Sequence, residues 1–146
     1  MKNPMTTSKL SSEWSLLQNQ FDSYEKYSLL IKLSSIGVLA TAYFTNHITA
    51  FVLLLLLILW LQDAIWKTFQ ARIDARILQL EDYLSNEHAL ENRDGIAFQF
   101  NSLYAQNRPG SVGLLKEYLR QSLRPTVAFP HIVLVAILAF RLFFIN

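Results

Sequence analysis

Three long runs of apolar residues, separated by polar segments, organise this chain. The middle run is the most apolar: residues 51–61 hold no polar side chain, and Thr49–Ala50 and Ala64–Trp66 lengthen the run at its ends. A helix that crosses a membrane needs about 20 mostly apolar residues, with roughly 17 as the lower limit. A helix that is apolar on every side also suits a bilayer better than a small soluble protein. The middle run therefore predicts a membrane-spanning helix.

Two further runs predict two more spans. The first covers about residues 27–44, where Lys32 interrupts it, and the third begins after Pro125 and covers about residues 126–145. Because the polar link 45–49 is short, the first two spans should form an antiparallel hairpin. We therefore expect an all-α integral membrane protein with three transmembrane helices and a helical cytoplasmic extension. Its expected parts are a cytoplasmic amphipathic helix (1–26), a transmembrane hairpin (27–66), a cytoplasmic helical region (67–125) and a third transmembrane helix (126–146).

The first span also invites comparison with a secretory signal, since Ala40–Ala42 follows an apolar run and imitates a cleavage site. The region in front of it is unusually long and holds few basic residues, and a second span follows at once. These features favour an uncleaved anchor.

Lys and Arg residues are distributed unevenly among the segments outside the spans. They occur before the first span and are missing from the hairpin link, and the long connection is rich in them: Lys67, Arg72, Arg76, Arg93, Arg108, Lys116, Arg120 and Arg124. Cytoplasmic loops of membrane proteins are enriched in these residues. We therefore expect the N-terminus and the long connection in the cytoplasm, and the hairpin tip and the C-terminus outside.

The helices of the hairpin should continue beyond the membrane. Before the first span, Leu10, Trp14, Leu17, Phe21 and Tyr24 recur at helical spacing, and after the second span Phe69, Ile73, Ile77, Leu80 and Leu84 do the same. Ser11 or Ser12 can cap the first helix. No Gly or Pro interrupts residues 49–86, which favours one continuous helix. The two extensions can pack on each other, lie on the membrane surface or form seams between subunits.

The rest of the long connection contains turns and one further amphipathic helix. Asp94–Gly95 indicates a turn, residues 96–100 fit either a short extended segment or a helical turn, and Arg108–Ser111 is a clear break. Ser111 can cap the helix that follows. That helix places Val112, Leu115, Leu119 and Leu123 on one face, and Lys116, Arg120 and Arg124 on a basic ridge.

Two ionisable residues are expected at the same depth in the hairpin. If the link is centred near residues 47–48, Lys32 and Asp63 lie side by side just inside the cytoplasmic boundary, and the third span brings His131 to a similar depth. Charged residues within spans are costly and often pair. Lys32 can extend to the headgroups while Asp63 reaches water, the two can form an ion pair that fixes helix register, or they can belong to a proton relay. His131 fits an interfacial position better than a relay.

Small residues mark one face of the first span. Ser34, Gly37 and Thr41 lie at spacings that allow close helix contact in lipid, so this face can serve helix packing or line a pore. Tyr43, Trp60 and Trp66 are most simply anchors at the membrane interface.

Composition and motifs argue against catalysis. Hydrophobic residues make up 52% of the chain and charged residues 16%, which suits a small membrane protein. The chain has no cysteine, which excludes disulfides and thiolate chemistry. It also has no phosphate-binding loop, no dinucleotide-binding glycine pattern and no paired histidines on a helix. We expect no enzyme activity, no cofactor and no metal site.

The block from Trp60 to Arg72 is similar to a pattern in small bacterial proteins with three transmembrane helices and largely unknown roles. In them an aromatic residue and an Asp end the second span, and an aromatic residue, Gln or Glu, and Arg follow. The later run from Phe98 to Tyr104, then from Leu114 to Pro125, is similar in layout. Some of these proteins resemble membrane effectors of anti-phage systems paired with a nucleotidyltransferase. The resemblance implies a bacterial inner-membrane location, and an oligomer that permeabilises the membrane on a nucleotide or oligonucleotide signal.

Two functions fit the sequence. The first is an oligomeric inner-membrane effector or channel, triggered at its cytoplasmic helices, where Arg72, Arg76, Lys116, Arg120 and Arg124 can contact an anionic signal or anionic lipids. The second is a non-conducting adaptor that binds a cytoplasmic partner protein. The expected partners are membrane lipids and further copies of the chain, and binding of double-stranded nucleic acid is not expected. A transporter is disfavoured, because three spans are too few for a repeat-built fold.

Overall fold

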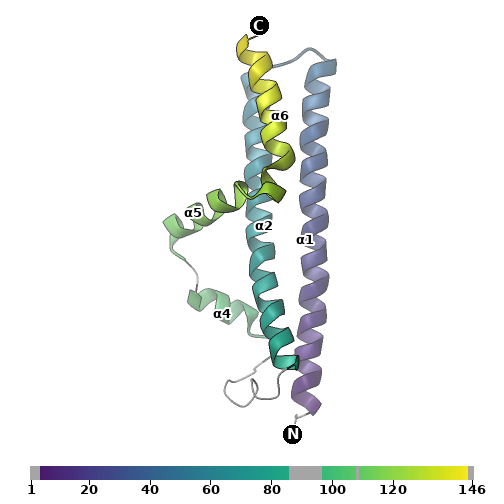
Figure 1. Cartoon of the computed structure of the whole chain (residues 1–146), viewed down its shortest axis with the longest axis vertical. Coiled ribbons are helices and arrows are strands. Elements are labelled where there is room, and N and C mark those ends of the chain that lie inside the picture. The colour runs from purple at the N-terminus through teal and green to yellow at the C-terminus, as the bar shows by residue number, and fades with distance from the viewer. Residues whose placement is uncertain (1–3, 86–96, 108, 145–146) are drawn as a thin grey trace. The chain divides into compact units, whose positions relative to one another are not determined.

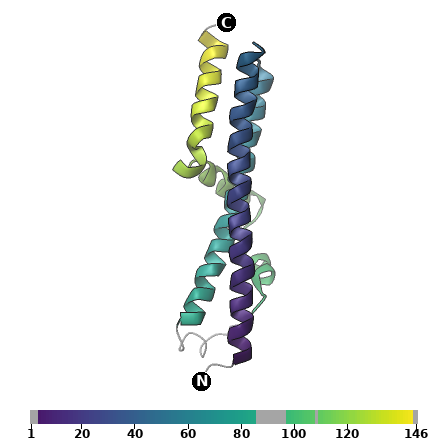
Figure 2. The same cartoon turned by 90° about the vertical axis from the view of Figure 1, so that its right-hand side faces the viewer.

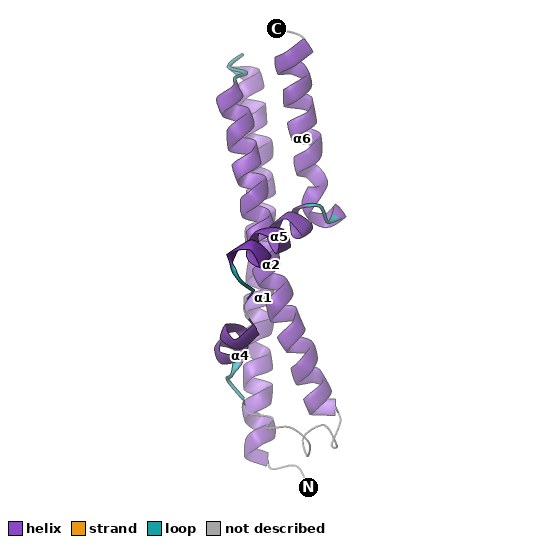
Figure 3. Cartoon of the chain, turned by 90° about the vertical axis from the view of Figure 1, so that its left-hand side faces the viewer, coloured by secondary structure: helices purple, strands orange, loops and turns teal. Residues whose placement is uncertain are grey.

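The structure is a computed structural model that describes residues 4–85, 97–107 and 109–144, and all regular structure in these ranges is α-helical (Figures 1 and 3). The helices are α1 (Pro4–Phe44), α2 (Ala50–Ser85), α4 (Phe100–Asn107), α5 (Ser111–Ser122) and α6 (Pro125–Phe144). The all-α prediction is confirmed. The proposed turn at Asp94–Gly95 lies outside the described residues, and of the segment 96–100 the described part is a turn that leads into α4.

Helices α1, α2 and α6 are, in the described part of the chain, the three that are long and apolar enough to cross a membrane. This confirms the predicted spans, and the chain is a multi-pass membrane protein by the length and composition of its helices. As expected from the absence of Gly and Pro, α2 continues without a break from Ala50 to Ser85.

The start of α1 differs from the expectation. The helix begins at Pro4, so the predicted cap at Ser11 or Ser12 is wrong. Proline suits the first helical turn, because its ring fixes φ and its missing N–H would lack a partner there anyway. The Ser12 hydroxyl donates a hydrogen bond to the carbonyl oxygen of Ser8, 2.9 Å away, which satisfies it inside the helix.

The chain forms two compact units. Unit 1 contains the described residues of Met1–Ser23 and Phe69–Gly110, and unit 2 contains those of Tyr24–Thr68 and Ser111–Asn146. Both α1 and α2 therefore contribute to each unit. Helix α4 belongs to unit 1, and α5 and α6 belong to unit 2.

In unit 1, the extensions of α1 and α2 pack on each other. Their buried apolar side chains are Leu10, Leu17, Ile73, Ile77 and Leu80. Polar contacts join the same two helices: Gln70 donates to the carbonyl oxygen of Phe21 (3.2 Å), and the indole N–H of Trp14 donates to Glu81 (3.1 Å). Of the three arrangements that the sequence allowed, the structure has the packed pair.

In unit 2, the link between α1 and α2 is a tight turn. Asn46 adopts a left-handed conformation with φ of 54°, which asparagine tolerates better than most residues. The N–H of Asn46 bonds to the carbonyl of Tyr43, and the N–H of His47 bonds to that of Ala42, the pattern of a Schellman motif. Thr49 then accepts from the first turn of α2. This turn makes the two helices antiparallel.

The core of unit 2 takes side chains from all three spans. Leu39 of α1, Leu56 of α2, and Leu134 and Leu138 of α6 form a buried cluster, and Figure 2 shows α6 beside the C-terminal part of α1. Helix α6 is kinked at Phe129 (φ −85°, ψ 131°), because Pro130 disfavours a helical conformation at the residue before it.

Candidate functional site

The candidate site is built around Asp63, a fully buried carboxylate of α2. Ser28 and Lys32 of α1 and His131 of α6 surround it, and we call these four residues the Asp63 cluster. Ser28 and Lys32 are four residues apart on one helix face, so both can reach the same carboxylate. His131 follows the kink of α6 directly. Each of the three spans thus places at least one polar side chain in this cluster.

The contacts of the cluster are specific. The Ser28 hydroxyl donates to Oδ1 of Asp63, and Nε2 of His131 lies 3.3 Å from Oδ2. The ammonium group of Lys32 lies 3.9 Å from Oδ2, the outer range of an ion pair, and donates to the carbonyl oxygen of Thr126 at 2.7 Å. A carboxylate in a membrane-spanning segment is tolerated when it is paired in this way.

The structure brings the predicted pair of Lys32 and Asp63 together, and Ser28 and His131 also contact the carboxylate. The alternative in which Asp63 reaches water does not fit its complete burial. His131 was expected at the interface, but its side chain is 1% exposed and faces Asp63. Sequence reasoning missed Ser28 entirely. The signal that was available was the four-residue spacing of Ser28 and Lys32 on one helix face.

An aromatic residue supports His131 within the cluster. The Trp60 ring stacks on the imidazole with centroids 6.3 Å apart, and its indole N–H donates to the carbonyl oxygen of Ser122 at 3.1 Å. Trp60 therefore links α2 to α6 and to the end of α5, instead of serving only as a free anchor. Nδ1 of His131 is buried and has no hydrogen-bond partner among the described residues.

The Asp63 cluster can fix the register of the three spans. Its members come from three helices, and each contact is lost if one helix slides by a turn. A proton relay needs a path to water on both sides, whereas Asp63 and His131 are closed off and Lys32 is 20% exposed. Beside Ser28 and Lys32 lies a shallow groove of about 260 Å³, which Glu25, Lys26, Leu29 and Lys67 also line.

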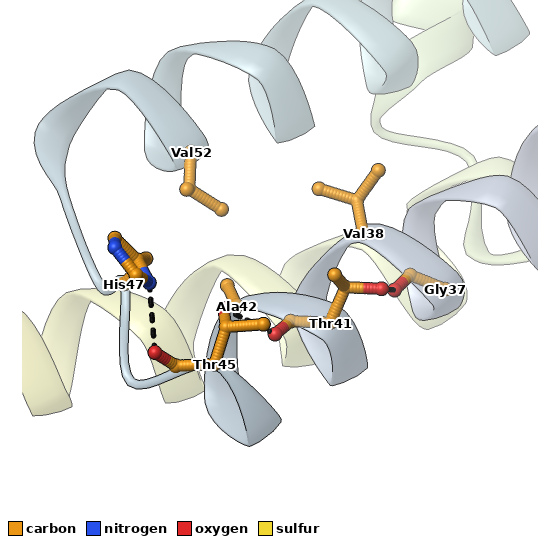
Figure 4. Close-up of a pocket in the computed structure, with 7 residues that line it drawn as sticks. All are labelled: Gly37, Val38, Thr41, Ala42, Thr45, His47 and Val52. Carbon is orange, nitrogen blue, oxygen red and sulfur yellow. Dashed lines mark hydrogen bonds between the residues drawn. The ribbon is translucent and has the colours of Figure 1, made fainter.

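The small-residue face of α1 lies apart from this cluster. Ser34, Gly37 and Thr41 are all exposed, and a Cβ atom added at Gly37 would meet no atom within 4 Å. A groove of about 420 Å³ adjoins this face (Figure 4) and is lined by Gly37, Val38, Thr41, Ala42, Thr45, His47 and Val52. The Thr41 hydroxyl donates to the carbonyl oxygen of Gly37 in its own helix, 2.8 Å away.

The five basic residues proposed for anionic contacts fall into two groups. Arg76 is buried in unit 1, where its Nε and Nη2 atoms bond to both carboxylate oxygens of Glu13 at 2.9 and 3.2 Å. Arg72 is half-buried, donates to the Tyr104 hydroxyl at 2.7 Å and stacks over that ring. Both guanidinium groups are thus already bonded within unit 1. Lys116, Arg120 and Arg124 of unit 2 are exposed.

The structure therefore has three notable features: the buried Asp63 cluster that connects the spans, an exposed small-residue face and an exposed basic ridge. Among the described residues, no group of three or more His, Asp or Glu side chains is placed to hold a metal ion. The chain matches no protein-family model, and neither curated proteins nor solved structures give a significant match.

Proposed function

We propose that this protein is an oligomeric inner-membrane effector, channel-like in character, that perturbs membrane integrity when it is triggered from its cytoplasmic side. The observation behind the proposal is the exposed face of Ser34, Gly37 and Thr41 on the first span. Small residues on such a face let a second helix approach closely, and they favour association in lipid. The resemblance to anti-phage effectors suggests that such an assembly acts in anti-phage defence. The proposal assigns no catalytic reaction and no cofactor.

The orientation in this proposal follows from the distribution of Lys and Arg. Unit 1 and the N-terminus face the cytoplasm, and the hairpin tip at residues 45–49 faces outward. Unit 1 is then the part that meets a trigger, such as a partner protein or a nucleotide signal. Because Arg72 and Arg76 bond within unit 1, the trigger would have to contact other side chains or displace these bonds.

A pore in this assembly would form between copies of the chain. The Asp63 cluster is closed inside each protomer, so its charges do not serve a shared channel. Exposed polar side chains within the spans include Ser34 and Thr41 of α1 and Gln62 of α2, and the Thr41 hydroxyl already bonds to its own helix. Such a pore would be narrow and gated by apolar side chains.

The substitution Gly37→Leu tests this proposal. The added side chain points into open space in the protomer, so the fold of the single chain should survive. Close contact between α1 and a helix of a second protomer should be lost, because the leucine side chain keeps the two helices apart. We expect the variant to lose the oligomer in native mass spectrometry from nanodiscs, and to lose dye leakage from triggered liposomes. The matched control is Ala136→Leu, which creates the same side chain at an exposed position of α6 and should change neither readout.

A non-conducting adaptor is the second candidate, and the internal bonding of the polar groups favours it. Thr41 and Thr45 both donate to carbonyl oxygens of their own helix, and Asp63 is enclosed by partners, so few polar atoms are left for a water column. An adaptor predicts sealed liposomes under all conditions, and binding of a cytoplasmic protein to unit 1. Leakage that depends on Gly37 would exclude it.

A further inference from the structure

Helix α5 turns a stripe of apolar side chains away from the rest of the protein. Its exposed side holds Val112, Leu115, Leu119 and, just beyond the helix end, Leu123, with exposed fractions of 83%, 56%, 55% and 69%. The opposite side holds Gln121, which is buried, and Leu114, Glu117 and Tyr118, which are half-buried. In water, an amphipathic helix turns its apolar stripe toward the protein. The outward stripe therefore indicates an apolar phase next to α5.

Basic side chains border this stripe. Lys116 and Arg120 follow Leu115 and Leu119 by one residue, which places them at its edge, and Arg124 continues the series beyond the helix; all three are exposed. A helix with an apolar stripe and flanking Lys or Arg is typical of segments that lie in the headgroup region of a membrane. A cytoplasmic leaflet with anionic lipids attracts such residues. The positive charge beside the stripe therefore favours contact with anionic lipids over contact with an apolar protein surface that has few acidic residues.

The position of α5 in unit 2 agrees with this environment. Helix α6, a membrane span, begins at Pro125, directly after the basic series. The indole N–H of Trp60, on the spanning helix α2, donates to the carbonyl oxygen of Ser122 and holds the end of α5 against the spans. Figures 1 and 3 show α5 running obliquely to α6 instead of continuing its axis. A helix that joins a span in this way can lie along the membrane surface.

We propose that α5 is an interfacial helix, bound to the cytoplasmic leaflet of the membrane that the chain crosses. Val112, Leu115, Leu119 and Leu123 lie among the upper acyl chains, and Lys116, Arg120 and Arg124 contact anionic headgroups. This assignment is independent of the proposed effector function, because it concerns how one protomer sits in lipid.

Site-directed spin labelling of the full chain tests the proposal without background, because the chain has no cysteine. Leu119→Cys carries the label on the apolar side of α5. Leu16→Cys is the matched control, a leucine of unit 1 with a comparable exposed fraction of 63%. Both variants are reconstituted into vesicles of phosphatidylethanolamine and phosphatidylglycerol, and collision with oxygen and with a water-soluble nickel chelate is measured.

We expect the label at residue 119 to collide with oxygen, to be shielded from nickel and to lie about 5–10 Å below the phosphates. The label at residue 16 should collide freely with nickel. Equal nickel access at the two sites would overturn the proposal. Shielding of residue 119 from both reagents would also overturn it, since a protein surface would then cover the stripe.

The contact of the basic residues with anionic headgroups is tested by a separate measurement. In vesicles without phosphatidylglycerol, or in a variant that combines Lys116→Gln, Arg120→Gln and Arg124→Gln, the label at residue 119 should lie closer to the aqueous phase. A depth that is unchanged in both cases would refute the assigned contact with anionic headgroups.

Discussion

The buried ion pair of unit 1 gives a prediction of defined magnitude. Glu13 is 3% exposed and Arg76 is 6% exposed, and the two make a bidentate contact at 2.9 and 3.2 Å. Oε2 of Glu13 also accepts the backbone N–H of Phe98 at 2.7 Å, which ties the segment before α4 to α1. A single carboxylate therefore joins three parts of the chain.

Glu13→Gln keeps the shape of the side chain and an acceptor for Phe98, but it leaves the guanidinium group of Arg76 without a carboxylate. Removing one partner of a buried ion pair costs about 3–5 kcal/mol. Because the Phe98 bond can persist in the variant, we expect a loss of about 3 kcal/mol. Since 1.4 kcal/mol is a factor of ten in an equilibrium constant, opening of unit 1 should become more frequent by a factor of about 100.

Hydrogen–deuterium exchange of the full chain in nanodiscs measures this opening. Amides of residues 4–23 and 69–85 should exchange about 100-fold faster in Glu13→Gln, up to the limit of an open chain, while amides of α6 should not change. Glu81→Gln is the matched control, since Glu81 is exposed yet also accepts a hydrogen bond; surface substitutions of this kind cost less than about 0.5 kcal/mol.

The double variant Glu13→Leu with Arg76→Met removes both charges at once. Replacing a buried ion pair by apolar residues of similar volume is often close to neutral. We expect exchange within about tenfold of the natural chain. Unchanged exchange in Glu13→Gln, or a double variant less protected than Glu13→Gln, would contradict this prediction.

Further substitutions probe the other contacts of the fold. Asp63→Leu, which removes both the charge and the hydrogen-bonding oxygens, should lower thermal stability in detergent by about 2–4 kcal/mol, and Asp63→Asn, which removes the charge but keeps a hydrogen-bonding group, by about 1 kcal/mol; equal effects would argue against a contribution of the hydrogen bonds to Ser28 and His131. Leu138→Ala should cost about 2–5 kcal/mol because the side chain is fully buried, whereas Ile137→Ala, at a site 43% exposed, should cost much less in the same thermal assay. Arg72→Lys should weaken protection of α4 in hydrogen exchange by about 1 kcal/mol, since lysine loses the planar stacking on Tyr104, and unchanged protection would contradict that contact.

The spans could be predicted from the sequence because each is a long apolar run, and lipid leaves the backbone few choices other than a helix. The continuity of α2 was predictable for a local reason, the absence of Gly and Pro from residues 49–86. The start of α1 was not, because Ser11 and Ser12 have the chemistry of a cap but sit inside a helix that Pro4 begins earlier. Several residues near the N-terminus can thus begin a helix, and the sequence alone does not say which of them does.

The candidate site was predicted only in part. Counting residues from the tight link placed Lys32 opposite Asp63, because an antiparallel hairpin has a fixed register. The depth of His131 was also expected, but its contact with Asp63 was not, because a residue count gives no rotation of α6 about its axis and the kink before Pro130 was not predicted. Arg76 illustrates the opposite case. Its charge suggested a surface role, but only the packed extensions reveal that Glu13 neutralises it in the core of unit 1.

The most direct test of the membrane topology uses single cysteines and a membrane-impermeant maleimide on intact bacterial cells. The cysteine-free chain allows Thr45→Cys at the hairpin tip, and Ser11→Cys or Leu78→Cys on exposed positions of unit 1. We expect labelling of residue 45 in intact cells, and labelling of residues 11 and 78 only after the membrane is permeabilised. Equal labelling of all three residues in intact cells, or protection of residue 45 until permeabilisation, would contradict this topology.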